Sequence, residues 1–206
     1  GDGRFVVYTS RSSLTDELNK VFLFDRATGA TTLVSRRAGS DPPSVANGQS
    51  DYARISADGR FVVFESEASD LVAGLADGNG RRDVFLWDRL SGTTRLVSRT
   101  PAGSPANHVS MDAQISDDGR IVVYRSYATD LGPVPLQAST PPVSHFYLYD
   151  ALTDTTVLVD HRAGAPWEAG ASGVGPSTNE SFAFTVSGDG RFVAYTSAAS
   201  NLVFGQ

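Results

Sequence analysis

The chain has 206 residues, of which 40% are hydrophobic, so it is long enough to bury a substantial core. Asp and Glu (23) outnumber Lys and Arg (17), and the net charge of −6 argues against a nucleic-acid partner. The absence of cysteine excludes disulfides, thiolate metal sites and cysteine nucleophiles, and no apolar run approaches the roughly 18 residues needed for membrane insertion.

One short phrase occurs four times along the chain and reads ISADGRFVVFES at 55–66. Its Asp-Gly-Arg anchors begin at Asp2, Asp58, Asp118 and Asp189, at intervals of 56, 60 and 71 residues. Such self-similarity is typical of repeat architectures. We therefore treat 1–206 as one segment, with repeats at about 2–57, 58–117, 118–188 and, in part, 189–206.

Each repeat is predicted to contain two β-hairpins. Asp-Gly between two β-rich runs favours a type I′ turn, in which both central residues have positive φ. The second hairpin, at 84–98 in the second repeat, turns at Gly92, and Gly29 and Asp154 are aligned with that glycine. We expect all three to take the left-handed conformation. One repeat therefore holds four short antiparallel strands.

Consecutive apolar residues indicate strands that are covered on both faces. Phe61–Phe64 and Val84–Trp87 are such runs, whereas a half-exposed antiparallel strand alternates between apolar and polar residues. Four-stranded units covered by copies of themselves stack as blades of an all-β β-propeller. A β-sandwich is the alternative, but it gives no reason for this repeat. Burial between blades is predicted for Phe61, Val63, Phe85, Trp87, Val123 and Tyr147.

The repeat is out of phase with the ends of the chain. The first copy begins at the turn into a second strand, and the last copy ends after a second strand. We expect three blades plus a partial fourth, forming an arc of a six- to eight-bladed propeller. The open faces, at Phe5–Tyr8 and Phe192–Tyr195, would require further blades from the same longer chain or from other copies.

The motif S-x-D-G-R-x-V-x-[FY]-x-S, followed by D-V-F-L-x-D-R-x-[ST]-G, resembles the TolB-like, or WD40-like (PD40), propeller repeats of bacterial exported proteins. The resemblance covers nearly the whole chain. It implies a β-propeller and an exported location that is periplasmic, cell-surface or secreted. Such blades occur in TolB, in propellers that precede prolyl-oligopeptidase-type hydrolases and in many surface proteins.

The loop ADGNGRRD at 76–83 is the best candidate for a metal site. Asp77, Asn79 and Asp83 could offer oxygen ligands to Ca²⁺ while the intervening glycines permit the bend. The alternative is a connecting loop between the second and third strands. We expect no other cofactor.

Three residues are candidates for ligand binding on the rim loops. His108 replaces Gly48 in the aligned phrase, and His145 is the last residue of a proline-rich segment at 127–145. Differences of this kind between repeats more often arise from surface drift than from function. Trp167 lies in a second long loop, where it could stack on a sugar, hold a peptide or fill the loop's own small core. The Asp that ends each third strand and the Arg of each anchor recur in every copy, which predicts a structural role.

No HExxH, P-loop, GxSxG or dinucleotide-binding motif is present. We therefore expect a non-enzymatic interaction module that binds a peptide, protein or glycan through its rim loops. One alternative is the propeller domain of an enzyme, a prolyl-oligopeptidase-type hydrolase or a glycan lyase, with its catalytic part elsewhere or at the central channel. A structural surface or filament subunit is the other.

Overall fold

The computed structural model describes residues 1–11, 18–75, 79–138, 142–170, 184–197 and 199–202. These residues form fifteen strands and no helix, which confirms the all-β prediction. Within the same residues there is accordingly no helix of the length and apolarity needed to cross a membrane.

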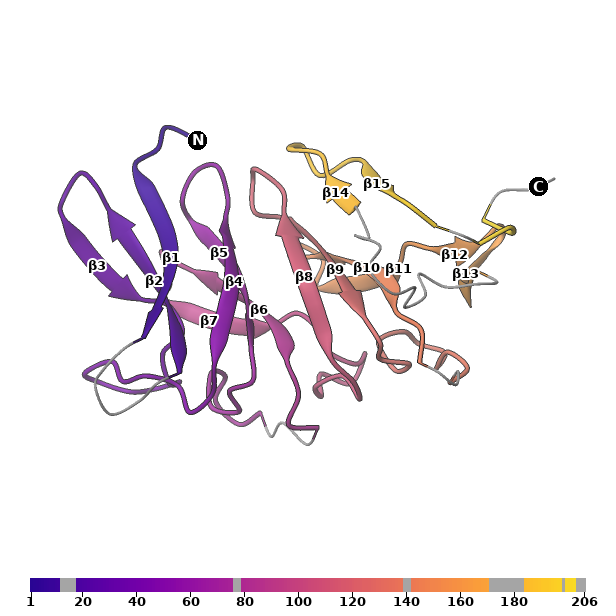
Figure 1. The fold of residues 1–206 in the computed structure, drawn as a ribbon, viewed down its shortest axis with the longest axis horizontal. Helices are drawn as coiled ribbons and strands as arrows, with labels where there is room; N and C mark the ends of the chain where they lie inside the picture. Colours follow the sequence, from indigo (N-terminus) through magenta and orange to yellow (C-terminus); the bar gives the residue numbers. More distant parts are fainter. Residues whose placement is uncertain (12–17, 76–78, 139–141, 171–183, 198, 203–206) are drawn as a thin grey trace.

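Of the five antiparallel sheets among the described residues, four stack face to face in a row (Figure 1). The first contains β1 (Phe5–Arg11), β2 (Asn19–Asp25) and β3 (Ala30–Leu33). The second contains β4 (Ser50–Ile55), β5 (Phe61–Ser66), β6 (Asp83–Asp88) and β7 (Thr93–Leu96). The third contains β8 (Ser110–Ile115), β9 (Ile121–Ser126), β10 (His145–Asp150) and β11 (Thr155–Leu158). The fourth contains β14 (Phe184–Val186) and β15 (Val193–Tyr195).

The sheets are the expected blades, because strand order within each sheet follows the sequence. The anchor phrase places β1 in line with β5, β9 and β15, the second strands of their blades. The first blade therefore lacks an innermost strand, and the last has only its first two, among the described residues. This confirms three blades plus a partial fourth. A short hairpin, β12 (His161–Arg162) with β13 (Ala165–Ala169), lies beside β11.

One apolar cluster lies between each pair of neighbouring blades. Five of the six residues predicted to be buried are at most 3% exposed: Val63, Phe85, Trp87, Val123 and Tyr147. The sixth prediction is only partly right, because Phe61 is partly buried. It begins its strand beside the Asp-Gly-Arg turn, where the blades end.

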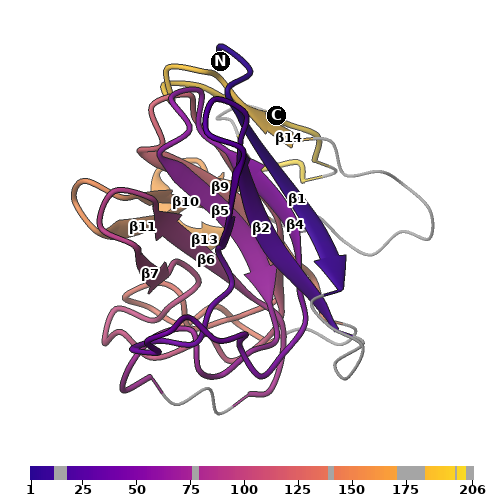
Figure 2. The same cartoon turned by 90° about the vertical axis from the view of Figure 1, so that its left-hand side faces the viewer.

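The outer face of the first blade is open. Val6 and Tyr8 are 45% and 38% exposed, whereas Val62 and Phe64, at the same positions of the second blade, are 0% exposed. Tyr8 still stacks on Phe22 of its own sheet with ring centroids 5.6 Å apart. Figure 2 looks onto this face of β1 and β2. The difference arises because the first blade covers this face of the second, whereas no described residues form a blade over the first.

The turn of the anchor phrase differs from the prediction. Only the glycine has positive φ, +69° at Gly59, so the turn is not type I′. Gly59 N donates to Ser56 O at 3.0 Å, while the Asp58 carboxylate accepts from Ser56 Oγ at 2.6 Å and from Arg60 N at 2.9 Å. These local bonds favour a type I turn followed by glycine. The residues closing the second hairpins have the predicted positive φ: Gly29 +74°, Gly92 +67° and Asp154 +59°.

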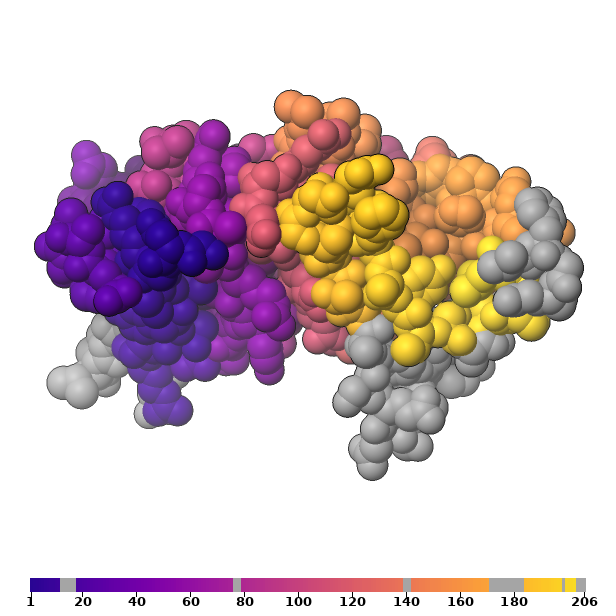
Figure 3. Space-filling model, turned by 90° about the horizontal axis from the view of Figure 1, so that it is seen from above, coloured from indigo at the N-terminus to yellow at the C-terminus, as the bar shows by residue number. Residues whose placement is uncertain are grey.

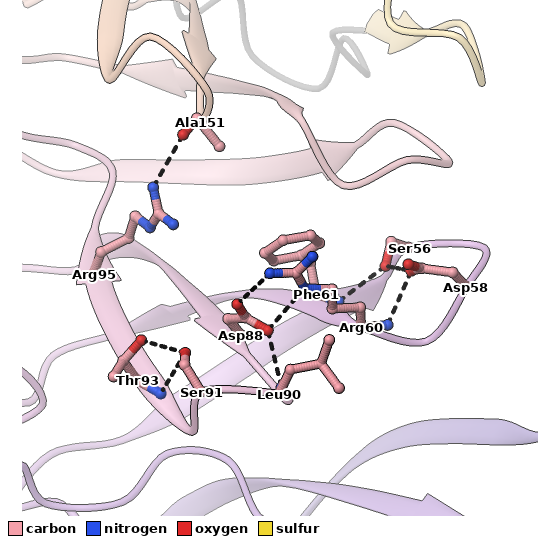
Figure 4. Close-up of polar contacts among 10 residues, drawn as sticks. All are labelled: Ser56, Asp58, Arg60, Phe61, Asp88, Leu90, Ser91, Thr93, Arg95 and Ala151. Atoms are coloured by element: carbon pink, nitrogen blue, oxygen red, sulfur yellow. Dashed lines mark hydrogen bonds and ion pairs between the residues drawn. The ribbon is translucent and has the colours of Figure 1, made fainter.

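In each of the first three blades, the Arg of the anchor phrase forms an ion pair with the Asp that ends the third strand. Arg60 Nε and Nη2 donate to Asp88 Oδ1 and Oδ2 at 3.0 and 2.8 Å (Figure 4). The same two-pronged contact joins Arg4 to Asp25 and Arg120 to Asp150. The hydrogen bonds from Arg60 hold the pKa of Asp88 below its usual value. The contact ties the second strand to the third in each blade, which confirms the structural role.

The Asp-Gly turns of the second, third and last blades each also receive a side chain from the preceding blade. A Cβ on Gly59 would lie 2.1 Å from the Phe5 ring, and one on Gly119 would lie 2.2 Å from the Phe61 ring. The backbones join at the same level, since Ala57 N donates to Asp117 O at 2.8 Å. Only glycine permits both the positive φ and this close approach.

A carboxylate is buried between the second and third blades. Glu65 is 2% exposed and accepts a hydrogen bond from Asp112 N at 2.6 Å, while Arg82 Nη1 lies 3.5 Å from its other oxygen. Asp112 has a φ of +59° at a bulge in β8. Loss of hydration on burial raises the pKa of Glu65 to about 7.

We expect Phe64→Ala to lower the free energy of unfolding by about 3–5 kcal/mol, because it leaves a cavity between blades. Tyr8→Ala, at the same repeat position on the open face, should cost less than about 1.5 kcal/mol. Urea denaturation of the two variants measures the difference. Equal losses would contradict the assignment of the open face.

The second prediction concerns pH. The folded chain holds the Glu65 proton more tightly than the unfolded chain, so this group stabilises the fold below about pH 4.5. That contribution should disappear as the pH rises through about 7, a change on the order of 3 kcal/mol. In urea melts across this range, Glu65→Gln should reduce the fall in stability. Glu67→Gln, on an exposed carboxylate, is the control, and an unchanged slope in Glu65→Gln would refute the assignment.

Candidate functional site

A cavity of about 220 Å³ opens in the third blade, at the strand ends opposite the Asp-Gly turns. Its described lining comes from loop residues 107–108, 127–129, 136–138 and 142–143 and from His145, the first residue of β10. These loops lie along the lower edge of Figure 1. The structure thus brings His108 and His145 to one pocket, whereas Trp167 is not among its lining residues.

Side-chain hydrogen bonds hold two of the pocket loops together. Asn107 Oδ1 accepts from Thr129 N at 3.0 Å, and Asn107 Nδ2 donates to Thr129 Oγ1 at 2.9 Å. Leu136 N donates to Thr129 O at 2.7 Å and so fixes the third loop. Asn47 and Ser69 form the same pair of bonds in the second blade. This pair of Asn side-chain hydrogen bonds is therefore part of the repeated scaffold, and it fixes the loops that line the pocket.

The pocket opens at a residue replacement that distinguishes the third blade. A Cβ on Gly48 would lie 2.4 Å from Ala68 N, so in the second blade the chain closes directly on the loop after β5. His108 occupies the aligned position and cannot approach as closely. Its imidazole lies against the ring of Tyr127, which replaces Glu67, with centroids 5.7 Å apart. Two replacements that are distant in sequence therefore meet in one wall.

The protonation of His108 follows from its hydrogen bond. Val109 N donates to His108 Nδ1 at 2.9 Å, so the ring proton is on Nε2. Burial, helped by the positive charge of Arg81, lowers the pKa of His108. At neutral pH the imidazole is therefore uncharged, with Nε2–H as its available donor.

The second imidazole has the opposite tautomer. His145 is 7% exposed, and its Nδ1 lies 2.9 Å from Asp160 Oδ2. Asp160 Oδ1 accepts from Phe146 N at 2.9 Å. Since the carboxylate accepts at both oxygens, Nδ1 carries the proton and Nε2 is an acceptor in the uncharged ring. No described residue forms a hydrogen bond with this nitrogen.

The same two positions hold a different pair in the second blade. There Ser98 Oγ donates to Asp83 Oδ1 at 2.6 Å, and Asp83 is 2% exposed. The acidic residue starts the third strand in the second blade but follows the fourth strand in the third blade. Because the acidic residue has moved to the position after the fourth strand, the start of the third strand can hold the imidazole of His145 at the pocket.

The candidate calcium ligands do not form a cluster in the described part of the chain. Asp83 lies in β6 and bonds to Ser98, while Asn79 Nδ2 donates to Ala106 O. Asp77 lies outside the described residues. Among the residues with assigned positions, no group of three or more His, Asp or Glu is placed to hold a metal ion. The calcium site therefore stays a prediction that depends on Asp77.

Trp167 lies on a strand, not in the irregular loop expected from the sequence. It belongs to β13, which pairs with β12 through a turn in which Gly164 has a φ of +75°. A Cβ on Gly132 would lie 2.3 Å from Trp167 Cε3, so the ring covers this glycine. The ring also packs against the apolar cluster that contains Leu131. Trp167 therefore supports the pocket loop from outside the pocket.

Tyr127, Leu136 and Asp160 contribute to the pocket or its hydrogen bonds but were not candidates on sequence grounds. Tyr127 and Asp160 both depart from the aligned residues of the second repeat, Glu67 and Ser98. These differences between aligned repeats are the sequence signal that could have identified both residues. Leu136 lies in an insertion that has no aligned counterpart, so no comparison between repeats could have found it.

No protein-family model matches this chain, and no curated protein matches its sequence. Among solved structures, TolB from Acinetobacter baumannii is 18% identical with a TM-score of 0.48, over 97% of this chain and 36% of that chain. The tricorn protease is 15% identical with a TM-score of 0.50, over 95% and 14% respectively. The β-propeller domain of the Trilobed protease from Pyrococcus furiosus is 11% identical with a TM-score of 0.48, over 76% and 38%.

This chain spans at most 38% of each of these structures. At such identities the similarity concerns the fold alone. It agrees with the stacked four-stranded sheets and with the order of strands inside them. The chain is a β-propeller segment, and its repeats are similar to those of TolB-like propellers.

Proposed function

We propose that this chain is a non-enzymatic binding module of an exported bacterial protein and that the pocket of the third blade binds a peptide segment. The observation that carries the proposal is the pair of imidazoles. His108 offers an Nε2–H donor, and His145 offers an Nε2 that accepts a hydrogen bond in the uncharged ring, in a pocket with largely apolar walls. A peptide group has one acceptor and one donor, so it complements this pair.

The apolar walls favour a peptide over a glycan. Leu136, Pro142 and Val143 line the pocket and suit an aliphatic or aromatic side chain next to the bound peptide group. A sugar commonly stacks on an aromatic face, but the Trp167 ring already covers Gly132. The Tyr127 ring likewise already lies against His108 and the Arg125 guanidinium. Glycan binding was also predicted for the rim loops, and the test below includes it as the alternative result.

The hydrogen bonds of the pocket's polar groups support a binding role and not a catalytic one. The Thr129 hydroxyl accepts a hydrogen bond from Asn107, and Asp160 contacts a backbone N–H as well as His145. Among the described lining residues, no hydroxyl is hydrogen-bonded to either imidazole, the arrangement that would activate a nucleophile. The exported location rests on the resemblance of the repeats.

The test replaces the two distinguishing residues by their second-blade counterparts. The double variant His108→Gly, Tyr127→Glu should close the pocket, because Gly48 and Glu67 accompany the close packing on Ala68. Peptides selected from a random display library on the parent chain should bind this variant at least about tenfold more weakly. Titration calorimetry measures both affinities.

Tyr52→Ala provides the control, because Tyr52 is 63% exposed on β4 and lies outside the pocket. It should leave the affinity unchanged. Two results would refute the proposal. In the first, the selected peptides bind the double variant as tightly as the parent. In the second, a glycan array identifies ligands whose binding is weakened by the double variant, while no peptide shows such a loss.

A further inference from the structure

The first blade has the same receiving site for an aromatic ring as the second. In the second blade, Arg89 Nε donates to Gly59 O at 2.9 Å, and its guanidinium lies 4.4 Å from the centroid of the Phe5 ring on that glycine. In the first blade, Arg26 Nη1 donates to Gly3 O at 2.8 Å, and Gly3 has a φ of +70°. The glycine and its arginine are therefore already in place.

The last blade presents the matching side chain. Phe192 follows the fourth Asp-Gly-Arg, as Phe5 follows the first, and is 64% exposed. The Arg191 guanidinium lies 5.5 Å from the centroid of its ring, as Arg4 lies 4.7 Å from that of Phe5. Phe192 therefore presents the aromatic group that Phe5 provides at the first blade junction.

The backbone and the sheet faces match as well. Asp117 N donates to Gly188 O at 2.8 Å, which continues the link from Ala57 N to Asp117 O. Gly188 N makes no backbone bond to any described residue, and Gly1 is its counterpart at the other end of the row. Around these atoms the first blade exposes Val6 and Tyr8, whose counterparts in the second blade are covered.

We propose that two copies of this chain associate head to tail, with Phe192 of one copy held between Gly3 and Arg26 of the next. The two faces lie on opposite sides of the second and third blades, which separate the indigo first blade from the yellow last sheet in Figure 3. The last two strands stack on the next copy's first blade as a separate blade and do not compete with β1 for a place in its sheet. Such a heterologous contact builds chains or a closed ring.

The experiment uses one charged variant on each face. Phe192→Asp blocks one face, and Val6→Asp blocks the other, and both side chains are exposed, so neither change buries a charge in the monomer. Light scattering after size exclusion should show association of the parent between about 1 and 100 μM. Each variant alone should associate at least about tenfold more weakly.

Mixing the two variants is the decisive step. Each retains the face that the other lacks, so an equimolar mixture should form a dimer of one of each and nothing larger. Leu152→Asp, at a residue 74% exposed, should associate like the parent, and circular dichroism should show all variants folded. A parent that stays monomeric throughout this range, or a mixture that stays monomeric, would overturn the proposal.

Discussion

The contact on which the architecture depends is the seating of one side chain on the glycine of the next blade's turn. Phe5 on Gly59 and Phe61 on Gly119 approach so closely that any Cβ would overlap the ring. The same glycines need positive φ to close their hairpins. One residue type therefore satisfies the turn and the blade spacing together. The neighbouring Arg, held by its Asp, lies over the ring and keeps the contact in place.

Most of the fold could be predicted because the phrase repeats and its apolar runs are continuous. Those features determine the strands, their two-sided burial and the incomplete first and last blades. The turn type could not be predicted, because it depends on hydrogen bonds from Ser56 and Arg60 to Asp58 that the Asp-Gly pattern does not contain. The β12–β13 hairpin was also missed, because its Gly, Ala and Pro residues are typical of loops, although the burial of β13 alternates as in a half-exposed strand.

The site was predictable only in part. His108 and His145 could be selected because they depart from the aligned repeats, but that pattern does not bring them together. Their partners come from other loops and strands, Tyr127 for one and Asp160 for the other. Asp83 looked like a loop ligand because acidic and glycine residues surround it in sequence. In the structure it belongs to β6, where Ser98 is its partner.

The serial stacking of the blades has a consequence for cooperativity. Each blade packs only on its neighbours, so its stability is the sum of its own sheet and at most two junctions. The second and third blades have two junctions each, while the first has one. Local opening should therefore start at the outer sheets and move inward. Amide protons of β5 and β9 would then exchange with solvent more slowly than those of β1, although the three strands share one sequence phrase.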